Sequence, residues 1–104
     1  MGNSVIVNML NGKMNINKNL TAYGICIPKE EINDALQVLR TNEKFSLAML
    51  EHQLIKRGIP HHGGANGKKG YIANRVADRI IQKLKREGHI KYSNERVWQW
   101  SANV

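Results

Sequence analysis

The chain has 104 residues, 41% of them apolar, and a formal net charge of +8. This length predicts one domain with a modest hydrophobic core. The single cysteine, Cys26, excludes an internal disulfide framework and favours a cytoplasmic location. No apolar run approaches the roughly 20 residues that span a bilayer, and the first residues lack a signal-peptide pattern, so no membrane association is expected.

The positive charge is confined to the second half of the chain. Residues 1–55 hold five bases and five acids, whereas residues 56–104 hold eleven bases and three acids. The second half therefore accounts for the whole net charge. Such asymmetry is typical of proteins that bind a polyanion, most often a nucleic acid.

Residues 5–18 carry a hairpin signal, because Asn11-Gly12 suits a two-residue type I′ turn between apolar positions. We treat residues 1–27 as an amino-terminal hairpin or arm, and 5–18 as a possible homodimer contact. A flexible arm is the alternative. Residues 19–27 fit either a linker or a short extended segment.

Two helices and a short strand are expected next. Pro28, with two acids after it, indicates a helix over 29–41. Residues 45–47 fit a very short strand, and apolar spacing predicts a helix over about 48–57. Residues 58–70 hold five of the nine glycines, so we expect a flexible basic loop, with Gly70 as a weak N-cap for the following helix.

Residues 71–87 form the most regular amphipathic stretch in the chain. Apolar residues recur every four positions from Ile72 to Leu84, with a second row that widens the stripe. The opposite face is rich in Arg, Asn and Gln, side chains that can make paired hydrogen bonds to base edges. The face fits either a DNA-reading helix or an ordinary solvated surface.

The last part of the domain predicts an antiparallel hairpin. Gly88 ends the helix, and the period then changes to two over residues 89–100, with a short turn at 93–95. Trp98 and Trp100 fall on one face of the second strand. At least one of them is expected to close the core over the helix at 71–87.

The order helix, strand, helix, loop, helix, hairpin resembles the winged-helix subclass of the helix-turn-helix family. The likeness lies in FSLAMLEHQLIKRG, ANRVADRIIQKLKREGHIKY and RVWQW and covers residues 30–100 or so. It implies a winged-helix domain over residues 28–104, with a three-helix core and a carboxy-terminal β-hairpin wing. Together with the amino-terminal hairpin predicted from Asn11-Gly12, the expected fold class is α+β. Two features depart from the family pattern, a longer glycine-rich loop between the second and third helices and a short wing turn.

The resemblance also implies that the helix at 71–87 enters a major groove of double-stranded DNA. The residues expected to reach base edges lie near its amino end: Tyr71, Asn74, Arg75, Asp78 and Arg79. The residues expected to bind phosphates are basic: Lys68, Lys69, Lys83, Lys85, Lys91 and Arg96.

Other chemistries have weaker patterns. Cys26 and the four histidines lack zinc-ligand spacing, and we expect His61 and His62 to point apart in an extended loop. A lone Cys26 between two isoleucines reads as a small core residue. GANGKKG lacks the spacing of a phosphate-binding loop. His61 and His62, if protonated below neutral pH, would strengthen phosphate binding. No enzymatic activity, metal, cofactor or small-molecule substrate is expected.

We therefore expect a small sequence-reading DNA-binding protein, a regulator of transcription or replication of the phage or plasmid type. The alternative is a winged-helix module that docks an acidic protein in a larger assembly. Binding of RNA or single strands is disfavoured, because the chain has six aromatic residues and no recognisable exposed stacking platform.

Overall fold

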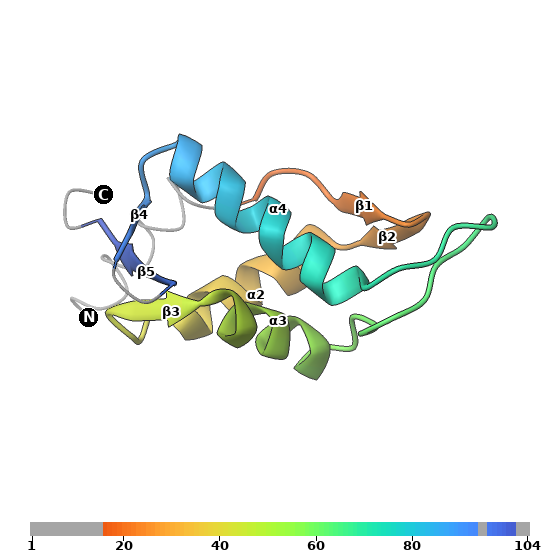
Figure 1. The fold of residues 1–104 in the computed structure, drawn as a ribbon, viewed down its shortest axis with the longest axis horizontal. Helices are drawn as coiled ribbons and strands as arrows, with labels where there is room; N and C mark the ends of the chain where they lie inside the picture. The colour runs from red at the N-terminus through yellow and green to blue at the C-terminus, as the bar shows by residue number, and fades with distance from the viewer. Residues whose placement is uncertain (1–15, 94–95, 102–104) are drawn as a thin grey trace.

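Three helices and two small antiparallel sheets make up residues 16–93 and 96–101, the part of the chain that this computed structural model describes (Figure 1). The class is α+β, as predicted. The helices are α2 (Lys29–Leu39), α3 (Leu47–Lys56) and α4 (Ile72–Arg86). The strands are β1 (Leu20–Ala22), β2 (Ile25–Ile27), β3 (Lys44–Ser46), β4 (Ile90–Tyr92) and β5 (Val97–Trp100).

The helix boundaries agree with the sequence within two residues. The helix predicted over 29–41 ends at Leu39, and the one predicted over 71–87 spans Ile72–Arg86. Ser46 is the N-cap of α3, where its side chain accepts a hydrogen bond from the Met49 backbone N–H at 3.2 Å. The N-cap of α4 is Tyr71 rather than Gly70, and its side chain makes no capping hydrogen bond.

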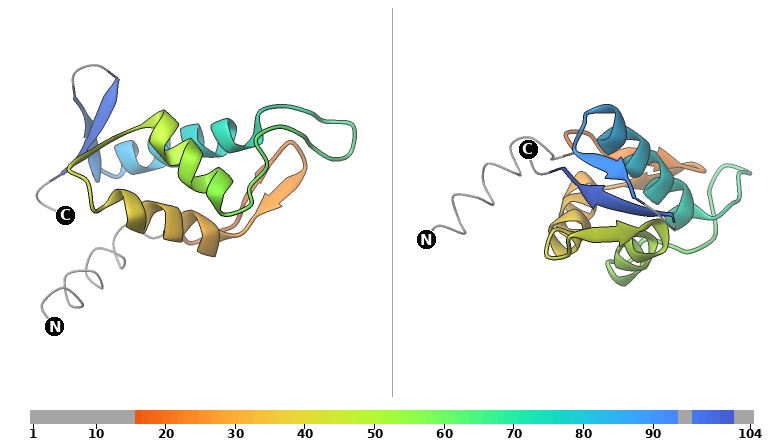
Figure 2. Two further views of the ribbon diagram at one scale, coloured as in Figure 1. Left: turned by 90° about the horizontal axis from the view of Figure 1, so that it is seen from below. Right: turned by 60° about the vertical axis from the view of Figure 1, so that its left-hand side comes forward.

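The apolar stripe of α4 forms the centre of the core. Ile72, Ala73, Val76, Ala77, Ile80, Ile81 and Leu84 are all buried, as the spacing predicts. The stripe packs mainly on α3, which in turn packs on α2, in a helix-turn-helix-like arrangement (Figure 2). Among the described residues every fully buried side chain is apolar, so the core holds no ionised group.

The carboxy-terminal hairpin predicted from the sequence is present and gains a third strand. β4 pairs with β5, and the short strand β3 pairs with the other edge of β5, which gives the order β3-β5-β4. Phe45 of β3 is fully buried beneath the sheet, and its ring lies 4.9 Å from that of Trp100. The Trp100 indole N–H donates to the Leu39 carbonyl, so this tryptophan closes the core at the end of α2.

An amino-terminal hairpin is also present, at residues 20–27. Its central residues, Tyr23 and Gly24, both have positive φ, as a type I′ turn requires. Ala22 and Ile27 of this hairpin are buried in the same core as α4. The extended alternative for residues 19–27 is thus confirmed. Of the hairpin predicted over 5–18, residues 16–18 belong to no strand, and the rest lies outside the described residues.

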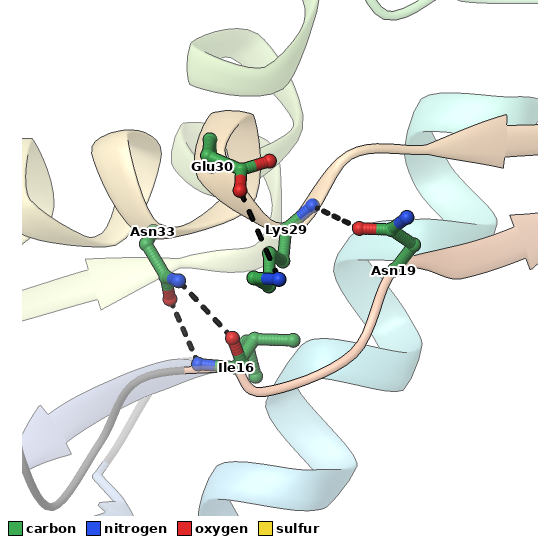
Figure 3. Close-up of polar contacts among 5 residues, drawn as sticks. All are labelled: Ile16, Asn19, Lys29, Glu30 and Asn33. Carbon is green, nitrogen blue, oxygen red and sulfur yellow. Dashed lines mark hydrogen bonds and ion pairs between the residues drawn. The ribbon is translucent and has the colours of Figure 1, made fainter.

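Residues 16–19 tie the start of β1 to α2 (Figure 3). The Asn33 side chain accepts a hydrogen bond from the Ile16 backbone N–H at 2.8 Å and donates one to the Ile16 carbonyl at 3.1 Å. Asn19 accepts from the first backbone N–H of α2, that of Lys29, at 2.9 Å. These bonds fix the direction from which the chain enters β1, and hence where the hairpin meets α4.

Across the described ranges, no helix is long and apolar enough to cross a membrane.

Candidate nucleic-acid interface

The solvent face of α4 is the most strongly basic helix surface that the sequence provides. Five of its residues are basic and only Asp78 is acidic. Asn74 and Arg75 are exposed near its amino end. Within the described part of the chain, the structure gives neither side chain a hydrogen bond or an ion pair. Their donors and acceptors therefore point to solvent and are available to a ligand.

Arg79, one of the residues predicted to read bases, has a partner inside the protein. Its Nη1 donates to the carbonyl oxygen of Thr21 in β1 at 2.6 Å. A guanidinium bonded to a backbone carbonyl is held at the flank of α4 that faces the amino-terminal hairpin. Arg75 and Arg79, which the sequence treats as equivalent, therefore occupy different environments.

The opposite flank of α4 faces the β3-β5-β4 sheet. Asp78 and Gln82 line a hollow together with Tyr92 of β4, Trp98 of β5 and Arg96. Tyr92 is 59% exposed and stacks edge-on against Trp98 at 5.4 Å. The predicted phosphate-binding residue Arg96 is thus close to the predicted base-reading residue Asp78. Lys91 is exposed on β4.

The carboxy-terminal end of α4 is partly neutralised by Glu87. Lys83 Nζ lies 2.8 Å from Glu87 Oε2, and His89 Nε2 lies 3.5 Å from the other carboxylate oxygen. The hydrogen bond from Lys83 holds the pKa of Glu87 below its usual range. Lys85 lies near the Trp98 ring, with Nζ 5.8 Å from its centroid. Lys83 and Lys85 are both predicted phosphate ligands, and of the two only Lys85 has no acidic partner within the described residues.

The amino-terminal end of α4 carries an aromatic cluster. Tyr71 is 60% exposed, and the rings of His61 and His62 both pack edge-on against it, at 5.5 and 5.2 Å. The expectation that the two histidines point apart is therefore wrong, because both imidazole rings contact the Tyr71 ring. Tyr71, before α4, and Tyr92, on β4, are the two exposed tyrosine rings beside the helix among the described residues.

The glycine-rich segment before α4, predicted as a flexible basic loop, is closed by one isolated β-bridge into a hairpin-like shape. Gly63 and Gly70 exchange backbone hydrogen bonds of 3.0 and 2.9 Å, and the Lys68 N–H bonds to the Ala65 carbonyl at 3.1 Å. The central residues of its turn, Asn66 and Gly67, have positive φ. We call residues 59–70 the arm from here on; this segment is distinct from the amino-terminal arm considered for residues 1–27. It projects beyond the amino end of α4, beside the β1–β2 hairpin, and carries the exposed Lys68 and Lys69 (Figure 1).

Two residues considered for other chemistry are not placed for it. Cys26 is exposed on β2, so the prediction that it is a small core residue is wrong; alternation along the three-residue strand turns Ile27 inward and Cys26 outward. Within residues 16–93 and 96–101 no group of three or more His, Cys, Asp or Glu side chains is arranged to hold a metal ion.

The sequence reasoning left Gln82, Arg86 and Tyr92 out of the candidate site, although all three are exposed on or beside α4. Gln82 and Arg86 were detectable, because they share the polar face of the stripe. Tyr92 could not be predicted as a site residue, because the two-residue alternation of a strand does not show which of its faces is exposed.

Comparison of the chain with protein-family models, curated proteins and solved structures gave no significant match. The functional argument therefore rests on the geometry of α4 and the elements around it.

Proposed function

We propose that this protein binds double-stranded DNA as a winged helix-turn-helix protein, with α4 in the major groove, and that it regulates transcription or replication. The observation that carries the proposal is the solvent face of α4. It presents Asn74 and Arg75 without partners inside the described chain, on a helix with five bases and one acid. Side chains of these two types make paired hydrogen bonds to adenine and guanine, respectively.

The arrangement around α4 supports the same proposal. The element order α2, β3, α3, α4, β4, β5 and the sheet order β3-β5-β4 are those expected of a winged helix. α3 packs against the apolar side of α4, and Asn74, Arg75 and Gln82 on the polar side remain exposed. A helix of 15 residues is ~22 Å long, so it can lie in a major groove about 12 Å wide with both ends beyond the bases.

In this proposal the predicted residues have distinct roles. Asn74 and Arg75 read base edges, and Asp78 accepts a hydrogen bond from a cytosine amine. Arg79 holds the β1–β2 hairpin against α4 and adds positive charge, but it is not a primary base contact. Tyr71 packs on the histidines and lies over the sugar-phosphate backbone at the amino end of the helix.

The phosphate contacts surround this face. Arg86 joins the set predicted from the sequence, and Lys83, paired with Glu87, contributes least. The other basic residues of the set are all exposed: Lys68, Lys69, Lys85, Lys91 and Arg96. Each such contact steepens the fall of affinity with salt by close to one unit of log-log slope.

Fluorescence anisotropy with a labelled duplex, measured over a range of salt concentrations, tests the proposal. We expect binding whose logarithmic affinity falls linearly with the logarithm of the salt concentration. Arg75→Ala should weaken binding to a preferred sequence about 5- to 150-fold, which corresponds to roughly 1–3 kcal/mol. Lys29→Ala, which removes one charge from the start of α2, is the matched control and should bind nearly as wild type does.

Competitors in the same assay distinguish the other functions. Structured RNA should not displace the duplex, whereas displacement by RNA would favour RNA binding. Absence of duplex binding, together with salt-sensitive binding of an acidic polypeptide, would favour the protein-docking alternative. Pairing of two copies through residues 5–18 is a separate prediction that lies outside the described residues, and sedimentation equilibrium with and without that segment tests it.

A further inference from the structure

The arm is a pre-shaped hairpin whose position is set by the rest of the fold. Its turn at Asn66-Gly67 has the backbone of a tight β-hairpin, and the Gly63–Gly70 pair closes its base. In an isolated segment with four glycines this geometry would be one conformation among many, because glycine gains the most backbone freedom on unfolding. Something outside the arm must therefore hold it.

The β1–β2 hairpin provides that support. The Ala65 backbone N–H donates to the Tyr23 carbonyl at 2.8 Å, which joins the two turns directly. The Tyr23 ring lies against Gly70 so closely that a Cβ on Gly70 would collide with it, and a Cβ on Gly24 would lie 2.8 Å from the Ala65 carbonyl oxygen. Gly24 thus permits a close approach to the backbone of the arm, and at position 70 a larger side chain would displace the Tyr23 ring.

In the sequence, the arm and the residues on either side of it carry only positive charge. Residues 52–77 contain no acid, and they contain Lys56, Arg57, Lys68, Lys69 and Arg75. Lys68 and Lys69 are exposed, and within the described residues neither has an ion-pair partner. A projecting hairpin with two exposed lysines and no acid in its own sequence is complementary to a row of phosphates rather than to base edges, because an ammonium is a point charge without paired donors.

The arm also stands opposite the wing. It leaves the amino end of α4, whereas the β3-β5-β4 sheet lies toward the other end of the molecule (Figures 1 and 2). A duplex held by α4 would therefore meet a basic hairpin at each end of the helix. This geometry differs from a simple turn between α3 and α4, which would leave the amino end of α4 without a flanking contact.

We propose that the arm is a second wing, which binds the phosphate backbone of the DNA on the side of α4's amino end and is held in place by Tyr23 and Gly70. The inference rests on the proposed function and adds a partner surface to it: a duplex that extends beyond the bases read by α4. Truncation of the duplex on that side should weaken binding as much as removal of the arm's charges.

The decisive variant is Lys68→Ala combined with Lys69→Ala, compared with Lys29→Ala combined with Lys44→Ala. Both pairs remove two exposed lysines, so the net charge changes equally. In salt-dependent anisotropy the arm variant should reduce the log-log slope by about 2, and the control pair by much less. In hydroxyl-radical footprinting the arm variant should lose protection on one side of the site only.

A second variant tests the support rather than the charge. Gly70→Ala keeps every lysine but places a methyl group where the Tyr23 ring lies, so the contact between this ring and the arm must change. We expect the same one-sided loss of protection, while Tyr23→Phe, which keeps the ring, should behave as wild type. Circular dichroism melting shows whether each variant retains the fold.

The outcomes separate this inference from the function on which it rests. If wild type binds no duplex, the proposed function fails, and the second wing fails with it. If wild type binds and the Lys68/Lys69 variant keeps the wild-type slope and footprint, DNA binding stands and the second wing is refuted. An equal loss of slope in the control pair would also refute it, because the effect would then be one of net charge alone.

Discussion

The hydrogen bond from Arg79 to Thr21 makes a prediction that separates two arginines one helical turn apart. Arg79→Ala removes a charge-assisted bond of 2.6 Å between α4 and β1. Such bonds contribute up to about 3 kcal/mol when buried, but this one is exposed, so we expect a loss of about 1 kcal/mol in the free energy of unfolding. For a domain of this size that loss lowers Tm by about 4–8 °C.

Arg75→Ala is the matched control for stability. Arg75 is exposed on the same helix and has no side-chain partner within the described residues, so its removal should change the free energy of unfolding by less than about 0.5 kcal/mol. Thermal unfolding followed by circular dichroism measures both variants. Equal melting temperatures for Arg79→Ala and wild type, combined with a loss of sequence preference as large as that of Arg75→Ala, would show that Arg79 leaves Thr21 to read bases.

Three further predictions concern the fold. Ile80→Ala should cost about 2–5 kcal/mol in urea denaturation, because Ile80 is fully buried in the α4 stripe; a cost below 1 kcal/mol would mean that α4 is not central to the core. Ser46→Ala should cost about 1 kcal/mol through loss of the cap to Met49, with Ser46→Asp as the variant that restores it. The hydrogen bond from Lys83 lowers the pKa of Glu87 in the folded state, so the stabilisation is present above the ordinary pKa of the carboxyl and is lost as the pH falls from that value through the lowered pKa. Glu87→Gln should flatten this part of the stability profile, and an unchanged profile would contradict the pairing.

Features that depend on local periodicity were predictable from the sequence. The seven apolar residues of α4 repeat at helical spacing, and that spacing alone identified the buried face and the polar one. The wing hairpin followed from a change of period after Gly88. The pairing of β3 with β5 was not predictable, because three residues around Phe45 carry no signal of which strand they will meet.

The arm shows why other features could not be predicted from the sequence. Asn66-Gly67 is the same type of turn signal as Asn11-Gly12, but its flanks are glycine and lysine rather than alternating apolar residues, so it reads as a loop. What gives it a defined shape is the contact with Tyr23, more than forty residues away. Arg79 is a similar case, since its partner Thr21 becomes visible only once β1 is placed beside α4.

The central claim, that the exposed face of α4 reads DNA sequence, is tested most directly by selection from a randomised duplex pool, with wild type and Arg75→Ala selected in parallel and Lys29→Ala as the control. We expect wild type and the control to enrich one motif, and Arg75→Ala to lose the preference at one or two positions while it keeps the remainder. Enrichment of no motif by wild type, or the same motif from wild type and Arg75→Ala, would contradict the account.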